Sequence, residues 1–226
     1  PYLTELQKKL ARPKCRNLAK TYAKYEFVLD DESYFTKSHT TLAGNDIFYS
    51  DNLQNTPDEV KNAYKSKFEG KVLVYIAISA RGVSAPLFFK SGLAVDQIVY
   101  KEECLAKRLV PFVRKYYRDD KYVFWPDLAS SHYATSVQEY LRTEKVHFVP
   151  KFMNPANVPK VRPIEDFWGL LKQKVYENDW STTKIPQLIK RIKWCVTKMD
   201  KKLIQKTFEG IHKRLAKAAR HGIESL

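Results

Sequence analysis

Short apolar, β-prone runs recur through the first half of the chain. They are Tyr25–Leu29, Ile47–Tyr49, Lys71–Ser79 and Ala85–Phe89. Runs of this kind are typical of β-strands, and together they predict three antiparallel strands. Arg81 and Gly82 separate the last two runs, which predicts a hairpin. The polar stretch 51–69 predicts a loop with one helical turn.

The middle of the chain alternates between helical and extended patterns. The apolar spacing over Val95–Tyr117 predicts one long helix, which Pro111 should bend or end early. The next segments are predicted as a strand at Tyr122–Trp125, a helix at Ala134–Leu141 and an extended run at Val146–Val149. Strand, helix and strand in succession are typical of parallel pairing.

Both ends of the chain are predicted to be helical. Residues 3–24 form a basic segment that should be helical but broken near Pro13. After a proline-rich loop, a helix should begin near Pro163, with Ile164, Phe167, Trp168, Leu171 and Val175 on one face. Two further amphipathic helices should follow, with Ile185, Leu188, Ile192, Cys195 and Met199 inward in the first and Ile204, Phe208, Ile211 and Leu215 inward in the second. Their outer faces are rich in lysine and arginine.

Composition narrows the class of protein. With 226 residues and 44% hydrophobic content, the chain can bury one sizeable core. Its formal net charge of +15 favours a polyanionic partner, which leaves DNA, RNA and acidic membranes open. No membrane-spanning run or signal peptide is evident, so we expect a soluble intracellular protein. Cys15, Cys104 and Cys195 form no CxxC pair, which argues against disulfides and a zinc site and predicts reduced, mostly buried thiols.

Three acidic residues stand at the ends of predicted elements. Asp31 and Asp127 follow short apolar strands, and Glu165 falls in the first turn of a helix. Converging carboxylates suit a pair of hard cations, because Mg²⁺ prefers oxygen ligands and bridges protein to phosphate. The alternative is that each acid is an ordinary cap or dipole partner, and position alone favours that interpretation.

Three motifs carry a more specific signal. They are LDDESYF at 29–35, WPDLASSH at 125–132 and NPANVPKVRPIEDFWGLLK at 154–172. In this order they resemble the first-acid motif, the second-acid motif and the Asn-Pro, Pro-Ile-Glu and Trp block of the Tc/mariner superfamily of transposases. Each motif alone is a weak signal, but the three together span most of the chain.

The resemblance implies an α/β fold of RNase H type, as in retroviral integrases. Such a fold has a five-stranded mixed sheet, three strands of it antiparallel, flanked by helices, with the carboxylates gathered at one end of the central strands. The resemblance divides the chain into a basic linker helix at 1–24, a catalytic core at 25–180 and basic C-terminal helices packed on the core at 181–226.

The resemblance also identifies Asp31, Asp127 and Glu165 as the catalytic triad, binding two Mg²⁺ or Mn²⁺ ions. The 37 residues between the last two acids, positions 128–164, resemble a branch of the superfamily with a longer loop and a terminal Glu. Leu128 replaces the family's Asn. Asp30 and Glu32 are rivals of Asp31; since side chains alternate along a strand, only one of the two sets faces the site, and we predict Asp31.

Several neighbours are candidates for accessory roles. His132 is a candidate to position a phosphate, a water or the loop of the second acid, with a solvent-facing or capping histidine as the alternative. Lys172 is a candidate phosphate contact, with an ordinary surface lysine as the alternative. Trp168 is expected to pack into the core rather than stack on a base. The predicted DNA-binding residues are Lys190, Arg191, Lys198, Lys202 and Lys206, with a solvated helix surface as the alternative.

The function implied by the resemblance is cut-and-paste transposition. A phosphodiester at each transposon end is hydrolysed, and the freed 3′-hydroxyl then attacks target DNA at the same site. The implied partners are transposon-end and target DNA and a second copy of the full-length protein, with no membrane, and the implied location is the nucleus. The family's N-terminal helix-turn-helix region is not seen in this sequence, so we expect weak, unspecific DNA binding. The alternatives are a nuclease or resolvase that cuts without joining, and a domesticated DNA-binding protein, against which the intact triad argues.

Overall fold

The computed structural model describes residues 5–38, 50, 52, 54–57, 70–90, 92, 94–156 and 158–226. The predicted strand Ile47–Tyr49 and most of the predicted loop 51–69 lie outside the described residues. None of the described helices has the length and apolar character needed to cross a lipid bilayer.

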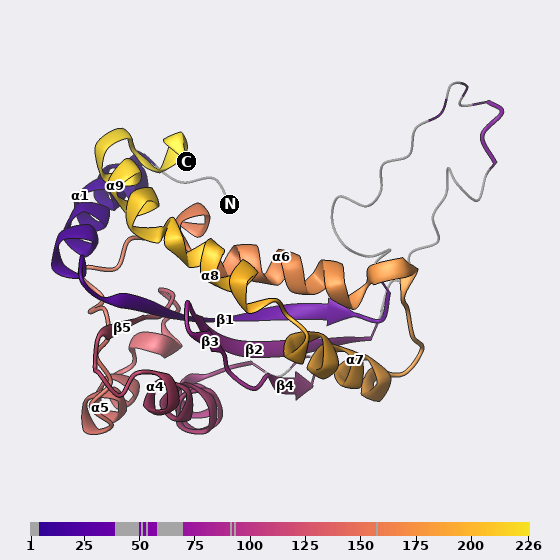
Figure 1. The fold of residues 1–226 in the computed structure, drawn as a ribbon, viewed down its shortest axis with the longest axis horizontal. Helices are drawn as coiled ribbons and strands as arrows, with labels where there is room; N and C mark the ends of the chain where they lie inside the picture. The colour runs from indigo at the N-terminus through magenta and orange to yellow at the C-terminus, as the bar shows by residue number, and fades with distance from the viewer. Residues whose placement is uncertain are drawn as a thin grey trace.

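A five-stranded mixed sheet lies at the centre of the fold (Figure 1). Its strands are β1 (Glu26–Thr36), β2 (Lys71–Ser79), β3 (Gly82–Val83), β4 (Leu87–Lys90) and β5 (Tyr122–Trp125). β2 pairs antiparallel with β1, β3 and β4, and β5 pairs parallel with the other edge of β1. The predicted fold class, the strand at Tyr122–Trp125 and the hairpin around Arg81 are confirmed.

Helices cover both faces of this sheet. They are α1 (Glu5–Thr21), α3 (Gln97–Val99), η2 (Tyr100–Leu109), α4 (Val110–Tyr116), α5 (Thr135–Thr143), α6 (Pro163–Val175), α7 (Ile185–Thr197), α8 (Lys201–Glu209) and α9 (Ile211–His221), with short 3₁₀ turns η3 (Ser131–Tyr133), η4 (Pro159–Val161), η5 (Glu177–Asp179) and η6 (Ile223–Ser225). Figure 1 shows α6 and α8 on one side of the sheet and α4 and α5 on the other. The predicted start of a helix at Pro163 is confirmed.

β1 is longer than its sequence suggested. It does not end at Leu29 but continues through the acidic cluster, because the whole stretch from Val28 to Thr36 pairs with β2. Asp31 lies opposite Ile76 in this register. Pairing with the buried strand β2 outweighs the low β-propensity of aspartate. The first acid therefore lies within a strand and not at its end.

Each face of the sheet has its own hydrophobic core. Leu29 and Phe35 of β1 belong to the core on the α6 side, whereas Val28 belongs to the core under η2 and α4. Side chains alternate along a strand, so odd-numbered residues of β1 face α6. Asp31 is on that side, and Asp30 is on the other.

The predicted helix over Val95–Tyr117 is a continuous helical segment built from α3, η2 and α4, and Pro111 does not end it. η2 is a π-helix, and at its end the amide of Val110 donates to the carbonyl of Leu105, five residues earlier. A proline has no amide hydrogen, and its ring clashes with the carbonyl four residues back in an α-helix. We attribute the continuity of the segment to the wider π register that precedes Pro111.

Three further expectations about secondary structure need correction. α1 passes through Pro13 unbroken, because its buried residues Ala11, Cys15 and Leu18 hold it in the core and it packs along α9. The last predicted helix is two helices, α8 and α9, separated at Gly210, a residue of low helix propensity. The extended run at Val146–Val149 adds only a single parallel bridge to β5. The predicted domain boundaries remain a prediction.

Candidate active site

Asp31, Asp127 and Glu165 line one cavity of about 580 Å³. Asp31 comes from the middle of β1, Asp127 is the second residue after β5, and Glu165 is the third residue of α6. β1 and β5 are parallel neighbours, and α6 runs over the Asp31 face of the sheet (Figure 1). The structure therefore brings together the three acids that the sequence singled out, while their catalytic role remains a prediction.

Asp31 is held by a buried tryptophan. Nε1 of Trp168 donates a 2.9 Å hydrogen bond to Oδ2 of Asp31. Trp168 is 4% exposed and packs against Phe35 and Phe167, which confirms that it belongs to the core. Burial raises the pKa of Asp31, whereas the charge of Arg162 and the Trp168 hydrogen bond oppose that rise. The link from Trp168 to the first acid was not visible in the sequence.

Asp127 is held by the turn that follows it. Its Oδ1 accepts a 2.9 Å hydrogen bond from the amide of Ala129 and lies 2.5 Å from Nδ1 of His132. Burial alone would raise the pKa of Asp127, but the contact with His132, the charge of His132 and the Ala129 amide bring that pKa below its usual value. His132 is 3% exposed and stacks on Tyr100 with ring centroids 3.8 Å apart. It is therefore not solvent-facing, and positioning the second acid is the predicted role that its geometry supports.

Glu165 is exposed in the first turn of α6. Burial of the carboxyl and the charge of Asp31 raise the pKa of Glu165, and Arg162 and Lys172 oppose that rise. Since the charge of Asp127 also raises the pKa of Asp31, Asp31 interacts with both of the other acids.

Arg162 is a functional candidate that the sequence reasoning missed. It is 8% exposed, lines the cavity and donates through its guanidinium to the carbonyls of Trp125 (3.3 Å), Pro126 (3.2 Å) and Asp30 (3.1 Å). These carbonyls belong to the two chain segments that carry the aspartates. Arg162 thus ties β1 to the end of β5 and places a positive charge among the acids. Its position directly before Pro163 in the third motif was the available signal.

Asn154 supports the second acid in a similar way. It is 1% exposed, and its Oδ1 accepts a 2.7 Å hydrogen bond from Nε1 of Trp125. Its Nδ2 lies 2.8 Å from both the carbonyl of Pro126 and the hydroxyl of Tyr133. The Asn-Pro motif therefore fixes the two residues that precede Asp127.

Asp30 and Glu32 point to the face of β1 opposite Asp31, as the alternation predicts. Asp30 is fully buried, and its Oδ2 accepts hydrogen bonds from the hydroxyls of Tyr75 (3.1 Å) and Tyr100 (2.5 Å). Burial raises the pKa of Asp30 to about 6 and that of Glu32 to about 8. Neither residue lines the cavity.

Lys172 lies close to the triad. Its Nζ is 5.6 Å from the centre of the Phe35 ring. Burial lowers the pKa of Lys172, and the charges of Asp31 and Glu165 oppose that effect. The accessory role predicted for Lys172 is therefore compatible with its position.

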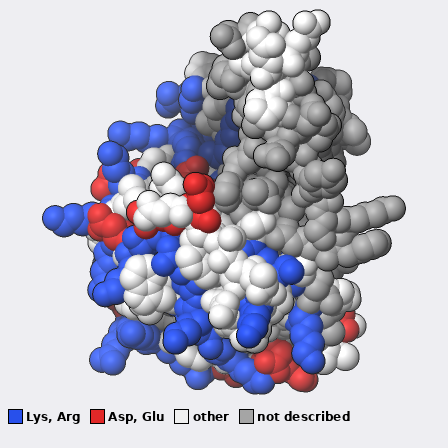
Figure 2. Space-filling model, turned by 90° about the vertical axis from the view of Figure 1, so that its right-hand side faces the viewer, with Lys and Arg blue, Asp and Glu red and all other residues white. Residues whose placement is uncertain are grey.

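The predicted DNA-binding residues are not equivalent in the structure. Lys190, Lys198, Lys202 and Lys206 are exposed on α7, α8 and the turn between them. The guanidinium of Arg191 instead donates to the carbonyls of Val175 (3.1 Å) and Lys174 (3.3 Å) and so caps the end of α6. Figure 2 shows that lysine and arginine side chains cover much of the described part of one face, interrupted by patches of acidic residues. DNA binding by all five residues remains a prediction.

The carboxylate oxygens at the cavity are suitable ligands for a hard divalent cation. The three side chains offer only oxygen ligands, which Mg²⁺ and Mn²⁺ prefer. Both contacts of Asp127 use Oδ1, and no hydrogen bond from the described residues reaches its Oδ2. The three acids share the cavity, but no three His, Cys, Asp or Glu side chains among the described residues are placed to hold one ion together.

The chain resembles known proteins in sequence and in fold. A stretch of 75 residues is 32% identical to the Tc3 transposase of Caenorhabditis elegans, covering 33% of this chain and 22% of that protein. No family model matches the chain.

The fold is shared with solved structures over nearly the whole chain. Mos1 transposase in a paired-end complex with the left transposon end matches with a TM-score of 0.78 and 19% identity, covering 97% of this chain and 63% of that one. The catalytic domain of Mos1 mariner transposase matches with a TM-score of 0.70 and 16% identity, covering 97% of this chain and 95% of that one. The chain thus spans less than two thirds of the Mos1 chain in the paired-end complex. This chain therefore shares the fold of the Mos1 catalytic domain.

Proposed function

We propose that this chain is the catalytic domain of a cut-and-paste DNA transposase, with Asp31, Asp127 and Glu165 as its catalytic and metal-binding residues. The observation that carries the proposal is that these acids reach one cavity from three separate elements. Acids that served only as helix caps or dipole partners would not be expected to line the same cavity. Mos1 transposase has been solved as a strand transfer complex and with transposon-end DNA, which supports the same activity here.

The proposed cofactors are two Mg²⁺ or Mn²⁺ ions held by the three carboxylates. Mos1 complexes solved with Mg and with Mn support the use of a divalent metal. When bound, such ions supply activation of the attacking oxygen and stabilisation of the leaving oxygen at a phosphodiester.

The chain's own residues prepare this site. Trp168 orients Asp31, and His132 with the Ala129 amide orients Asp127. Arg162 holds the strand ends together and reduces the repulsion that an approaching phosphate meets from the acids. Hydrolysis at a transposon end and attack by the freed 3′-hydroxyl on target DNA use the same cavity in succession.

The proposed partners are transposon-end DNA, target DNA and a second copy of the protein, and the proposed location is the nucleus. A net charge of +15 supports a polyanionic substrate.

The test is Mg²⁺-dependent nicking of plasmid DNA by the chain and by Asp127→Asn. Asparagine is preferred to alanine because its Oδ1 can still accept the Ala129 amide, so the turn keeps its hydrogen bond. Nicking by the wild type and none by the variant supports the proposal. A strand-transfer assay with a pre-cut end distinguishes the rivals: a nuclease or resolvase nicks without joining, and a domesticated DNA-binding protein does neither.

A further inference from the structure

Gly169 stands at a position where the fold does not require glycine. It is an exposed residue in the interior of α6, and glycine there is less stable than alanine. A Cβ added at Gly169 would meet nothing within 4 Å among the described residues. Neither packing nor backbone conformation requires glycine here, and the missing side chain leaves this part of the α6 surface open to close approach.

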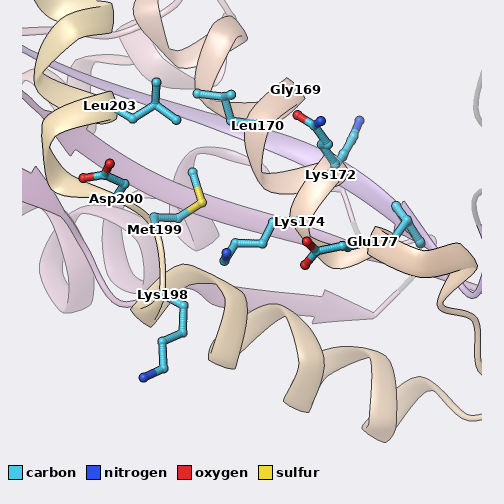
Figure 3. A pocket seen from close by; sticks show the side chains of 11 residues that line it. Gly169, Leu170, Lys172, Lys174, Glu177, Lys198, Met199, Asp200 and Leu203 are labelled. Carbon is cyan, nitrogen blue, oxygen red and sulfur yellow. The ribbon is translucent and has the colours of Figure 1, made fainter.

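Gly169 lines a groove of about 690 Å³ between α6 and the junction of α7 with α8 (Figure 3). Both lysine and apolar side chains line the groove. The lysines that line it are Lys172, Lys174 and Lys198, and the apolar side chains that line it are Leu170, Met199 and Leu203. Two acids, Glu177 and Asp200, also line it, but Asp200 is used as the N-cap of α8, where its side chain accepts from the Lys202 amide at 2.8 Å.

The groove adjoins the candidate active site. Gly169 follows Glu165 by four residues and Lys172 follows it by seven, so the three lie along one face of α6. Lys172 lines the groove and also interacts with the charges of Asp31 and Glu165. Lys172 therefore links the groove to the triad electrostatically.

We propose that this groove is the track along which a DNA strand continues from the active site, and that Gly169 lets its sugar–phosphate backbone lie directly against α6. The proposal rests on the proposed function. Lysine side chains match the charge of the phosphates, and the apolar side chains accommodate the faces of the sugars. A second copy of this chain is the alternative occupant, but the lysines that line the groove and the interaction of Lys172 with the acids of the triad favour DNA.

The test uses Gly169→Ala and Gly169→Gln, because each should change stability and DNA binding in opposite directions. Both residues are better helix formers than glycine, so the melting temperature should rise by about 2 to 4 °C. The affinity for a fluorescein-labelled DNA duplex, measured by anisotropy in metal-free buffer, should fall, and for Gly169→Gln by about tenfold. Gly210→Ala is the matched control, because Gly210 lies outside the groove and its Cβ would meet only the Arg214 side chain at 3.8 Å.

Higher stability with weaker DNA binding in both Gly169 variants, and unchanged DNA binding in Gly210→Ala, supports the proposal. DNA affinity equal to that of the wild type overturns it. A lower melting temperature shows that the fold needs Gly169 and also overturns it. Loss of self-association in gel filtration with unchanged DNA affinity assigns the groove to a second copy of the chain. If the Gly169 variants bind DNA more weakly but the wild type shows no metal-dependent nicking, the groove binds DNA and the proposed catalysis is refuted.

Discussion

Replacing Trp168 by phenylalanine should weaken metal binding at Asp31 while leaving the fold in place. Phenylalanine retains an aromatic ring between Phe35 and Phe167 but has no Nε1 to donate to Oδ2 of Asp31, a hydrogen bond of 2.9 Å in the wild type. The substitution therefore separates the orienting role of Trp168 from its packing role.

The expected size of the effect follows from the type of interaction that is removed. A hydrogen bond to a charged group contributes about 1.5 to 3 kcal/mol, and loss of a residue that orients a metal ligand typically lowers metal affinity by about 10- to 100-fold. The Trp168 hydrogen bond favours the charged carboxylate, so without it the pKa of Asp31, already raised by burial, should rise further. Protons then compete better with the metal, and the decrease in affinity should be larger at pH 6 than at pH 8.

Isothermal titration of Mn²⁺ into the metal-free protein at these two pH values measures the effect directly. Trp194→Phe is the control, because Trp194 is 48% exposed and stacks on Arg191 at 5.1 Å. We expect wild-type affinity in the control and at least about tenfold weaker binding in Trp168→Phe. Equal Mn²⁺ affinity in the wild type and Trp168→Phe at both pH values would refute the role given to Trp168.

Three further predictions concern the buried acid, the basic surface and the thiols. The pKa of Glu32, about 8, lies above that of an unfolded glutamate, so the folded state binds more protons between these values and the metal-free melting temperature should fall as pH rises from about 5 to about 8. Glu32→Gln should make that decrease smaller. A wild-type melting temperature that rises over this pH range would contradict the raised pKa of Glu32. The logarithm of the DNA-binding constant should fall with the logarithm of the salt concentration, and Lys198→Glu with Lys202→Glu should make this slope shallower by about 0.9 for each phosphate that the variant no longer binds. An unchanged slope would show that both lysines belong to a solvated surface and do not bind DNA. Burial raises the pKa of Cys15 to about 11 and the other two cysteines are also buried, so Ellman's reagent should find no fast-reacting thiol in the native protein and three after denaturation.

Local pattern was enough to predict the residues that meet at the cavity. Alternation along a strand separated Asp31 from Asp30, and the structure places them on opposite faces of the sheet. Pro163 marked the start of α6 and so placed Glu165 in its first turn. Both inferences need only the period of one element, which a single sequence carries.

Contacts between distant segments could not be predicted in this way. The length of β1 depends on pairing with β2, 35 to 51 residues further along the chain, and Trp168 reaches Asp31 across 137 positions. Arg162 joins carbonyls at Asp30 and Pro126, which only the folded topology brings together. Periodicity describes one element at a time, so partners of this kind appear only when the elements are packed.

The most direct test of the metal-dependent active site compares two neighbouring acids in the first turn of α6. Glu165 lines the cavity, whereas Asp166 forms a 3.0 Å ion pair with Arg214. Glu165→Gln and Asp166→Asn each remove one negative charge from the same helical turn. In a plasmid-nicking assay with Mg²⁺, we predict wild-type nicking by Asp166→Asn and only the metal-free background by Glu165→Gln. Nicking by Glu165→Gln at the wild-type rate would contradict the assignment of the active site.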